Sequence, residues 1–179
     1  NGYPDKAETD GLIGKATVSW NPDDGIMYYV TWSEGFRPGL LNRPVGSSNA
    51  DGSYTVKPEV DTDEITNYEF GWKTITKDGQ LRFNGSAFYV DVTGLQSTIF
   101  DPSIVNLFFS DNAADATIKG VEGDFTYFTN IEGLSVAGAF SFLDTEITEK
   151  LVPTNDVVVG EELAFAPGMQ GNVRVRQEW

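Results

Sequence analysis

The chain has 179 residues, enough for one domain of ordinary size, and its 27 acidic and 12 basic residues give a formal charge of −15. This excess of acidic residues argues against a basic surface that binds nucleic acid. The chain contains no cysteine and no histidine, which excludes disulfides, thiolate chemistry, the usual zinc ligands and a Ser-His-Asp catalytic site within it. The 19 glycines and the aromatic content of 13% favour an all-β protein with many turns.

Alternation of apolar and polar residues predicts strands along most of the chain. Tyr68, Phe70 and Trp72 alternate with Glu69 and Lys73, and successive side chains of a strand face opposite sides. This pattern therefore predicts a strand with one apolar and one polar face. We predict about seven antiparallel strands of this kind, at residues 12–20, 26–32, 64–73, 80–92, 116–127, 134–145 and after residue 168.

The expected connections between these strands alternate between short and long. Short turns are expected at 21–25, 76–79 and 129–133, and long loops at 34–62, 97–115 and 146–168. In an up-and-down sheet every second connection lies at the same end, so the short turns share one end and the long loops share the other. This asymmetry is typical of outer-membrane barrels, whereas a soluble sandwich mixes loop lengths at both ends.

The two faces of the expected sheet differ in chemistry. The apolar face is aromatic, at positions 20, 28, 32, 68, 70, 72, 125, 127, 140, 142 and 179. The polar face carries charges, at positions 15, 69, 73, 82, 122, 124, 174, 176 and 178. A barrel wall with lipid outside and water inside explains both faces, and the alternative is an aromatic sandwich core. About seven strands cannot close a single-chain membrane barrel, so the barrel interpretation requires further strands.

Four ordered motifs resemble one family, the TonB-dependent outer-membrane receptors. They cover roughly residues 12–145. The motifs are Ser33-Glu34-Gly35-Phe36-Arg37-Pro38-Gly39 with Leu41-Asn42, Lys57-Pro58-Glu59 with Tyr68-Glu69-Phe70-Gly71-Trp72-Lys73, Phe88-Tyr89-Val90-Asp91 with Gln96, and Asn112-Ala113-Ala114-Asp115-Ala116 with Lys119-Gly120-Val121-Glu122.

The resemblance implies a 22-stranded transmembrane β-barrel in the outer membrane of a Gram-negative bacterium, plugged by an N-terminal globular domain. Such receptors import scarce large solutes, such as iron–siderophore complexes, cobalamin or oligosaccharides. An inner-membrane TonB energising complex supplies the energy for this import and acts on the receptor through the plug. This chain shows neither a plug nor an energy-coupling box. We therefore interpret residues 1–179 as a single partial barrel domain. Its expected partners are lipid, the plug, the remaining barrel strands and the transported ligand.

A transport receptor neither forms nor breaks a covalent bond in its solute, so we expect no catalytic residue, no cofactor and no metal site. The acidic loops also lack a calcium-binding loop of the hand type. The expected ligand contacts lie on the long loops, where Arg suits anionic chelates and aromatic rings stack on catecholates or sugars. They are Phe36, Arg37, Asn42, Arg43, Phe108, Phe109 and Asn112. The alternative function is that of a soluble β-sandwich binding module for carbohydrate or adhesion.

Overall fold

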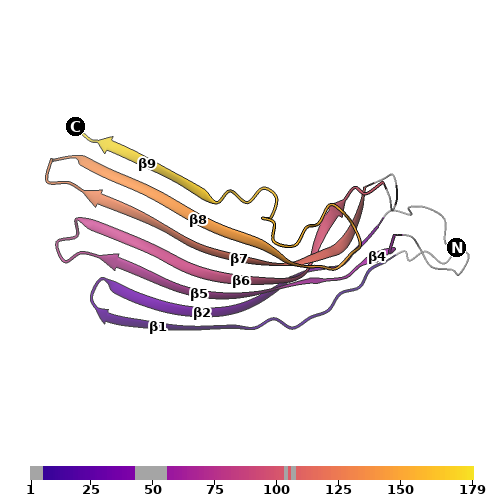
Figure 1. The fold of residues 1–179 in the computed structure, drawn as a ribbon. Helices are drawn as coiled ribbons and strands as arrows, with labels where there is room; N and C mark the ends of the chain where they lie inside the picture. Colours follow the sequence, from indigo (N-terminus) through magenta and orange to yellow (C-terminus); the bar gives the residue numbers. More distant parts are fainter. Residues whose placement is uncertain (1–5, 43–55, 103–104, 106–107) are drawn as a thin grey trace, which may run out of the picture.

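The computed structural model describes residues 6–42, 56–102, 105 and 108–179. Seven strands form one antiparallel sheet in the order β1-β2-β5-β6-β7-β8-β9 (Figure 1). β3 pairs with β4 in a separate hairpin. The strands are β1 (Lys15–Asp23), β2 (Ile26–Arg37), β3 (Leu40–Leu41), β4 (Glu59–Val60), β5 (Asp63–Ile75), β6 (Leu81–Ile99), β7 (Phe109–Phe128), β8 (Leu134–Lys150) and β9 (Met169–Gln177). Within the described residues, β1 and β9 are the two edges of the sheet, each paired on one side only.

The prediction of seven antiparallel strands is confirmed, and the differences lie at the strand ends. The first strand begins at Lys15 rather than at residue 12, and β2 continues to Arg37, inside the expected loop 34–62. That loop also contains the β3–β4 hairpin, which the sequence did not predict. The hairpin of β6 and β7 extends well into the expected loop 97–115, because the two strands stay paired as far as Ile99 and Phe109.

All short connections lie at one end of the sheet and all long connections at the other, as expected (Figure 1). The three short turns each place a glycine, Gly25, Gly79 or Gly133, at a positive φ of 96°, 73° or 72°. Glycine adopts this left-handed conformation without a steric cost, and so closes tight hairpins readily.

The buried core lies at the long-loop end rather than beneath the sheet. Its buried members come from three places: the end of the β6–β7 hairpin, the segment before β4 and the β8–β9 connection. They are Val56, Ile99, Phe109, Ala113, Ala114 and Val157. The sheet itself therefore presents both faces outward over most of its length. No helix in the described part of the chain is long and apolar enough to cross a membrane.

Candidate functional site

The register of the sheet sorts the side chains into rows, because residues paired across neighbouring strands lie on the same face. One row runs Trp20, Tyr28, Trp72, Gly85, Gly123, Phe140 and Gly171. The next row runs Val18, Val30, Phe70, Ala87, Val121, Phe142 and Met169. Every strand aromatic residue expected on the apolar face shares this face, so the two-faced prediction is confirmed.

The apolar face is exposed even in the middle of the sheet. Phe70 on β5 and Phe142 on β8 are 45% and 50% exposed, although both strands have neighbours on each side. The apolar rows run from Leu81 to Tyr89 on β6, eight residues apart in the sequence. At about 3.4 Å per residue and a strand tilt of about 40°, this band is about 21 Å tall. That height is close to the roughly 25 Å apolar band of outer-membrane barrels.

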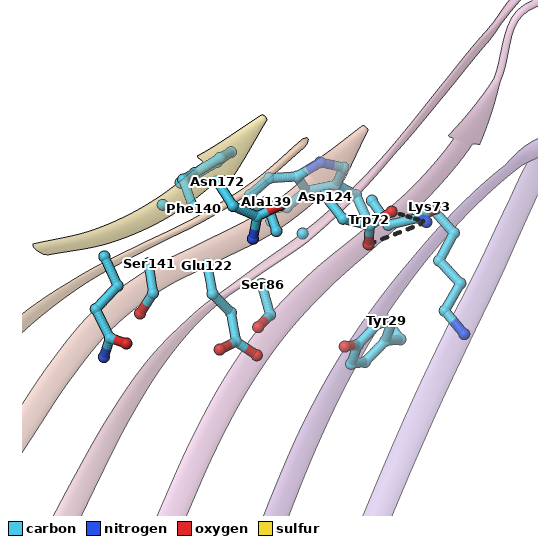
Figure 2. A pocket seen from close by; sticks show the side chains of 15 residues that line it. Tyr29, Trp72, Lys73, Ser86, Glu122, Asp124, Ala139, Phe140, Ser141 and Asn172 are labelled. Carbon is cyan, nitrogen blue, oxygen red and sulfur yellow. Dashed lines mark hydrogen bonds between the residues drawn. The ribbon is translucent and has the colours of Figure 1, made fainter. Parts of the chain in front are cut away.

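The opposite face is polar and contains a hollow of about 560 Å³. Residues of β2, β5, β6, β7, β8 and β9, which are consecutive in the sheet, line it. Among them, Tyr29, Ser86, Glu122, Ser141 and Gln170 form a single row. Figure 2 shows Tyr29, Ser86 and Glu122 on the same side of the sheet.

One row closer to the short turns, Asn84 donates hydrogen bonds to both carboxylate oxygens of Asp124, at 3.2 and 3.4 Å (Figure 2). Of the charged residues expected on the polar face, Lys73, Glu122 and Asp124 line the hollow. Within the described residues, no group of three or more acidic side chains is placed to hold a metal ion.

Tyr29 is an aromatic residue on the polar face that the sequence analysis did not single out. Its ring lies across Gly71, its partner on β5, and its hydroxyl donates to Glu69 Oε1 at 2.5 Å. A Cβ atom on Gly71 would lie 2.1 Å from the Tyr29 ring, so only glycine leaves room for it. The ring thereby covers exposed backbone and fixes the direction of the Glu69 carboxylate.

The same arrangement recurs on four other strand glycines. In each case the register partner on the neighbouring strand is an aromatic residue whose ring lies against the glycine. The pairs are Gly85 with Trp72, Gly120 with Phe88, Gly123 with Phe140, and Gly138 with Phe125. Aromatic rings placed over strand glycines help to pin the register of a sheet. The sequence shows the residues, but the pairs become visible only once the register is known.

At the long-loop end, Arg37 is bound into a hydrogen-bond network. Its guanidinium forms an ion pair with Asp63 and also donates to the backbone carbonyl of Gln96 at 2.9 Å. The backbone N–H groups of Arg37 and Gln96 donate to the same carboxylate, at 3.2 Å each. The Asp63 side chain is only 3% exposed, whereas that of Arg37 is 52% exposed. This network ties β2, β5 and β6 together where they leave the sheet.

Both asparagines among the expected ligand contacts hold backbone segments together. Asn42 donates to the carbonyls of Lys57 and Ser110, at 2.8 and 2.6 Å, and accepts from the Ser110 N–H at 2.8 Å. Asn112 donates to the carbonyls of Asp61 and Gly94, and accepts from the Asp61 N–H at 2.8 Å. The β3–β4 hairpin is thereby fastened to the β6–β7 hairpin.

The aromatic candidates differ in exposure. Phe109 is buried in the core at the long-loop end, whereas Phe108 is 69% exposed and its ring centroid lies 4.8 Å from that of Phe100. Phe36 is partly exposed on the outer face, opposite Glu64. The last candidate, Arg43, lies outside the described residues. Among the expected contacts that the structure describes, Phe108 therefore has the most accessible side chain, followed by Arg37, whose guanidinium is held by Asp63.

The connections β6–β7 and β8–β9 contact each other across the same rim. Asp101 accepts hydrogen bonds from the Thr154 hydroxyl at 2.9 Å and from the Asn155 N–H at 3.2 Å. Asp156 in turn accepts from the Phe100 N–H at 2.9 Å. Thr154 is almost completely buried. These contacts join connections that are about fifty residues apart into one rim with the β3–β4 hairpin.

Known structures share this arrangement of strands. The ferric yersiniabactin uptake receptor FyuA from Yersinia pestis matches with a TM-score of 0.65 and 16% identity, over 91% of this chain and 22% of that chain. The ferripyoverdine receptor of the outer membrane of Pseudomonas aeruginosa matches with a TM-score of 0.61 and 16% identity, over 96% and 21%. BauA, the ferric preacinetobactin receptor from Acinetobacter baumannii, matches with a TM-score of 0.59 and 20% identity, over 89% and 22%.

The chain spans about a fifth of the length of these receptors. No curated protein sequence matches it. The family model for the β-barrel of TonB-dependent receptor-like proteins matches residues 2–179, which is almost the whole chain. The resemblance found in the four sequence motifs is thus confirmed, and the chain belongs to the TonB-dependent receptor β-barrel family.

Proposed function

We propose that this chain forms part of the wall and outer rim of an outer-membrane receptor that takes up a scarce large solute by TonB-driven transport. One observation carries the proposal: a single sheet presents an exposed aromatic band on one face and a polar, hollowed face on the other. An exposed apolar surface of this extent requires a partner, and lipid is the partner that fits a band of this height.

The arrangement of the sheet disfavours the alternative, a soluble sandwich. A sandwich core needs a second sheet packed about 10 Å away on the aromatic face. In the described part of the chain, the one other sheet is the two-stranded β3–β4 hairpin, which is fastened to the long-loop rim. Phe70 and Phe142 remain half-exposed as a result.

For the ligand, we propose an iron–siderophore complex captured at the long-loop rim. The structurally similar receptors are named for ferric yersiniabactin, ferripyoverdine and ferric preacinetobactin, which supports this class. Phe108, which is exposed and whose ring contacts that of Phe100, is the proposed aromatic contact. Arg37, Asn42 and Asn112 support the rim instead, because they are occupied by backbone and carboxylate partners. This mode of action needs no catalytic residue.

Inside the barrel, we propose that the polar wall faces the plug domain through which the TonB complex acts. Glu69 and Glu122 lie in neighbouring rows of the wall, and within the described residues neither lies within ion-pair distance of a Lys or Arg. Glu69 accepts one hydrogen bond from Tyr29, and a lumen-filling domain would supply the further donors that carboxylates removed from water require.

The transport proposal is tested with the full-length receptor in a strain that has no other siderophore receptor. Uptake of ⁵⁵Fe is measured with ferric catecholate, ferric hydroxamate and ferric phenolate siderophores, with and without the energising complex. We expect energy-dependent uptake of one class, and at least a ten-fold loss of binding affinity in Phe108→Ala. Failure of every class to bind or enter would overturn the siderophore proposal.

The membrane placement is tested separately, by tryptophan fluorescence. Trp20, Trp32 and Trp72 lie on the outer face and should be quenched by quenchers attached to lipid chains. Fluorescence that responds only to water-soluble quenchers would support the soluble sandwich instead. The two tests are independent, so a barrel that transports another class of solute is distinguished from a soluble module.

A further inference from the structure

The polar wall carries a group of basic residues near the short-turn end. Lys73, Arg82 and Arg174 lie on the polar face, on β5, β6 and β9. Arg82 and Arg174 belong to one row, because the register links Arg82 to Thr126, Thr126 to Ala137, and Ala137 to Arg174. Lys73 lies one row further from the short turns, diagonally across from Arg82. We name Lys73, Arg82 and Arg174 the basic band.

The basic band is unusual in a chain with 27 acidic and 12 basic residues. Glu69 and Glu122 lie in rows nearer the middle of the wall, and Asp124 lies in the same row as Lys73. The charge on this face therefore changes from negative at Glu69 and Glu122, through a row that carries both signs, to positive at Arg82 and Arg174. In the described part of the chain, no carboxylate lies within 4.0 Å of a charged nitrogen of the basic band. The nearby Lys77 and Arg176, by contrast, are paired with Asp23 and Glu178.

Two members of the band share a hollow. Lys73 and Arg82 line a depression of about 470 Å³ together with the β1–β2 turn and Asn84. Asp23 and Asp24 belong to that turn, and Asp23 is already engaged by Lys77 at 3.3 Å. Two like charges at a diagonal position in a sheet repel each other unless an anion lies between them. The hollow therefore provides space and positive charge for at least one carboxylate.

The width of the band favours a protein surface over a small anion. Arg82 and Arg174 are separated by three strand spacings, which is about 14 Å at about 4.8 Å per strand. A single small anion cannot contact both side chains. A folded domain with several carboxylates on one face can do so, and each contact would be a charge-assisted hydrogen bond.

We propose that the basic band docks an acidic surface of the domain that fills the lumen, at its short-turn end. The inference rests on the proposed function, since it requires that the polar face line a filled lumen. It adds where the charged groups of the partner lie along the wall. Carboxylates of the partner lie at the level of Arg82 and Arg174, and its hydrogen-bond donors lie at the level of Glu69 and Glu122. This charge reversal along the wall fixes the orientation in which the partner fits.

The test uses zero-length carbodiimide coupling in the full-length receptor, which joins a lysine amine to a carboxylate in direct contact. Lys73 is a native probe, and Arg82→Lys and Arg174→Lys extend the probe along the band while they keep its charge. Lys77 is the positive control, because its amine lies 3.3 Å from Asp23 within the chain. Lys119, whose register partner is Tyr89 at the upper border of the apolar band, is the negative control.

Mass spectrometry of the coupled receptor should show all three probes joined to Asp or Glu residues of the lumen-filling domain. The double variant Arg82→Glu/Arg174→Glu should lower the coupling of Lys73 to that domain at least ten-fold, with barrel folding unchanged. The proposal is overturned if the probes couple only to wall carboxylates such as Asp24 and Asp124, or not at all while the Lys77–Asp23 product forms. A receptor that passes the lipid-quenching test but shows no such coupling refutes the docking proposal and leaves the proposed function intact.

Discussion

The ring of Tyr29 lies directly over Gly71, its partner across the β2–β5 pair, and the Tyr29 hydroxyl donates to Glu69, two residues before Gly71 on β5. The contact leaves no room for any side chain at position 71, because a Cβ atom there would lie 2.1 Å from the ring. Tyr29 therefore both fills the space above the glycine and orients a carboxylate of the polar wall.

Replacing Gly71 with Ala should destabilise the barrel by about 1–3 kcal/mol, the usual cost of overpacking. The ring of Tyr29 must move, and its hydrogen bond to Glu69 is lost with it. The measurement is urea unfolding of the full-length receptor in lipid vesicles. Gly35→Ala on β2 is the matched control, since a Cβ atom there meets nothing within 4 Å. Equal stability of the two variants would contradict the contact.

A charge on the outer face should cost far more than the same charge on the inner face. Phe142→Arg places a cation in the apolar band, with an expected cost of about 2–4 kcal/mol near the membrane midplane. Ser141→Arg, one residue earlier on β8, places it on the polar wall, where we expect a change close to zero. Folding into vesicles measures both. A larger loss for Ser141→Arg would reverse the assignment of lipid and lumen faces.

Asp63→Ala should loosen the long-loop rim without unfolding the sheet. The substitution leaves the Gln96 N–H and the Arg37 guanidinium without their buried acceptor, at a local cost of about 1–3 kcal/mol. Hydrogen exchange at Arg37 and Gln96 should accelerate by about ten-fold or more, since each 1.4 kcal/mol corresponds to a factor of ten. Asp61→Asn is the control, because Asn112 contacts the backbone of Asp61 and not its side chain. Unchanged exchange in Asp63→Ala would show that the network does not hold the rim.

The β5–β6 turn should show a weak pH dependence. The Thr76 hydroxyl donates to the Asp78 carboxylate at 2.5 Å and the Gln80 N–H donates at 3.0 Å, and these bonds hold the pKa of Asp78 below its ordinary value of 3.8. A lowered folded-state pKa means that the stabilisation is present above pH 3.8 and is lost as the pH falls through the folded-state value. NMR titration of the Asp78 carboxyl carbon should confirm the direction, and Thr76→Val should move the pKa back toward 3.8. A wild-type pKa at or above 3.8 would contradict these hydrogen bonds.

The strands and the two faces could be predicted from the sequence because they depend on local alternation. Tyr68, Phe70 and Trp72 are two residues apart, and a period of two assigns them to one face whatever their partners are. The rim could not be predicted in the same way. Arg37 pairs with Asp63, and Asn42 bonds to Ser110, so those contacts depend on segments that come together only in the fold.

The expected ligand contacts show the limit of reasoning from residue type. Arg37, Asn42 and Asn112 have side chains that suit a polar ligand, but the same donors and acceptors also satisfy the backbone of irregular loops. Phe108 and Phe109 are adjacent and chemically identical, yet one is exposed and the other is buried. Alternation of this kind at the start of β7 decides which aromatic ring meets solvent, and the strand end was not placed correctly from the sequence.

In the described part of the chain, the outer edges of β1 and β9 pair with no other strand, which has a practical consequence for anyone who produces these 179 residues alone. Each edge offers a row of free amide and carbonyl groups beside an oily surface, which is the geometry that nucleates stacked, fibril-like aggregates. Refolding in detergent micelles would cover the apolar face but leave the backbone groups of both edge strands exposed. Preparation of this segment without aggregation should therefore require neighbouring strands supplied in the same polypeptide, or a chaperone that covers the two edges.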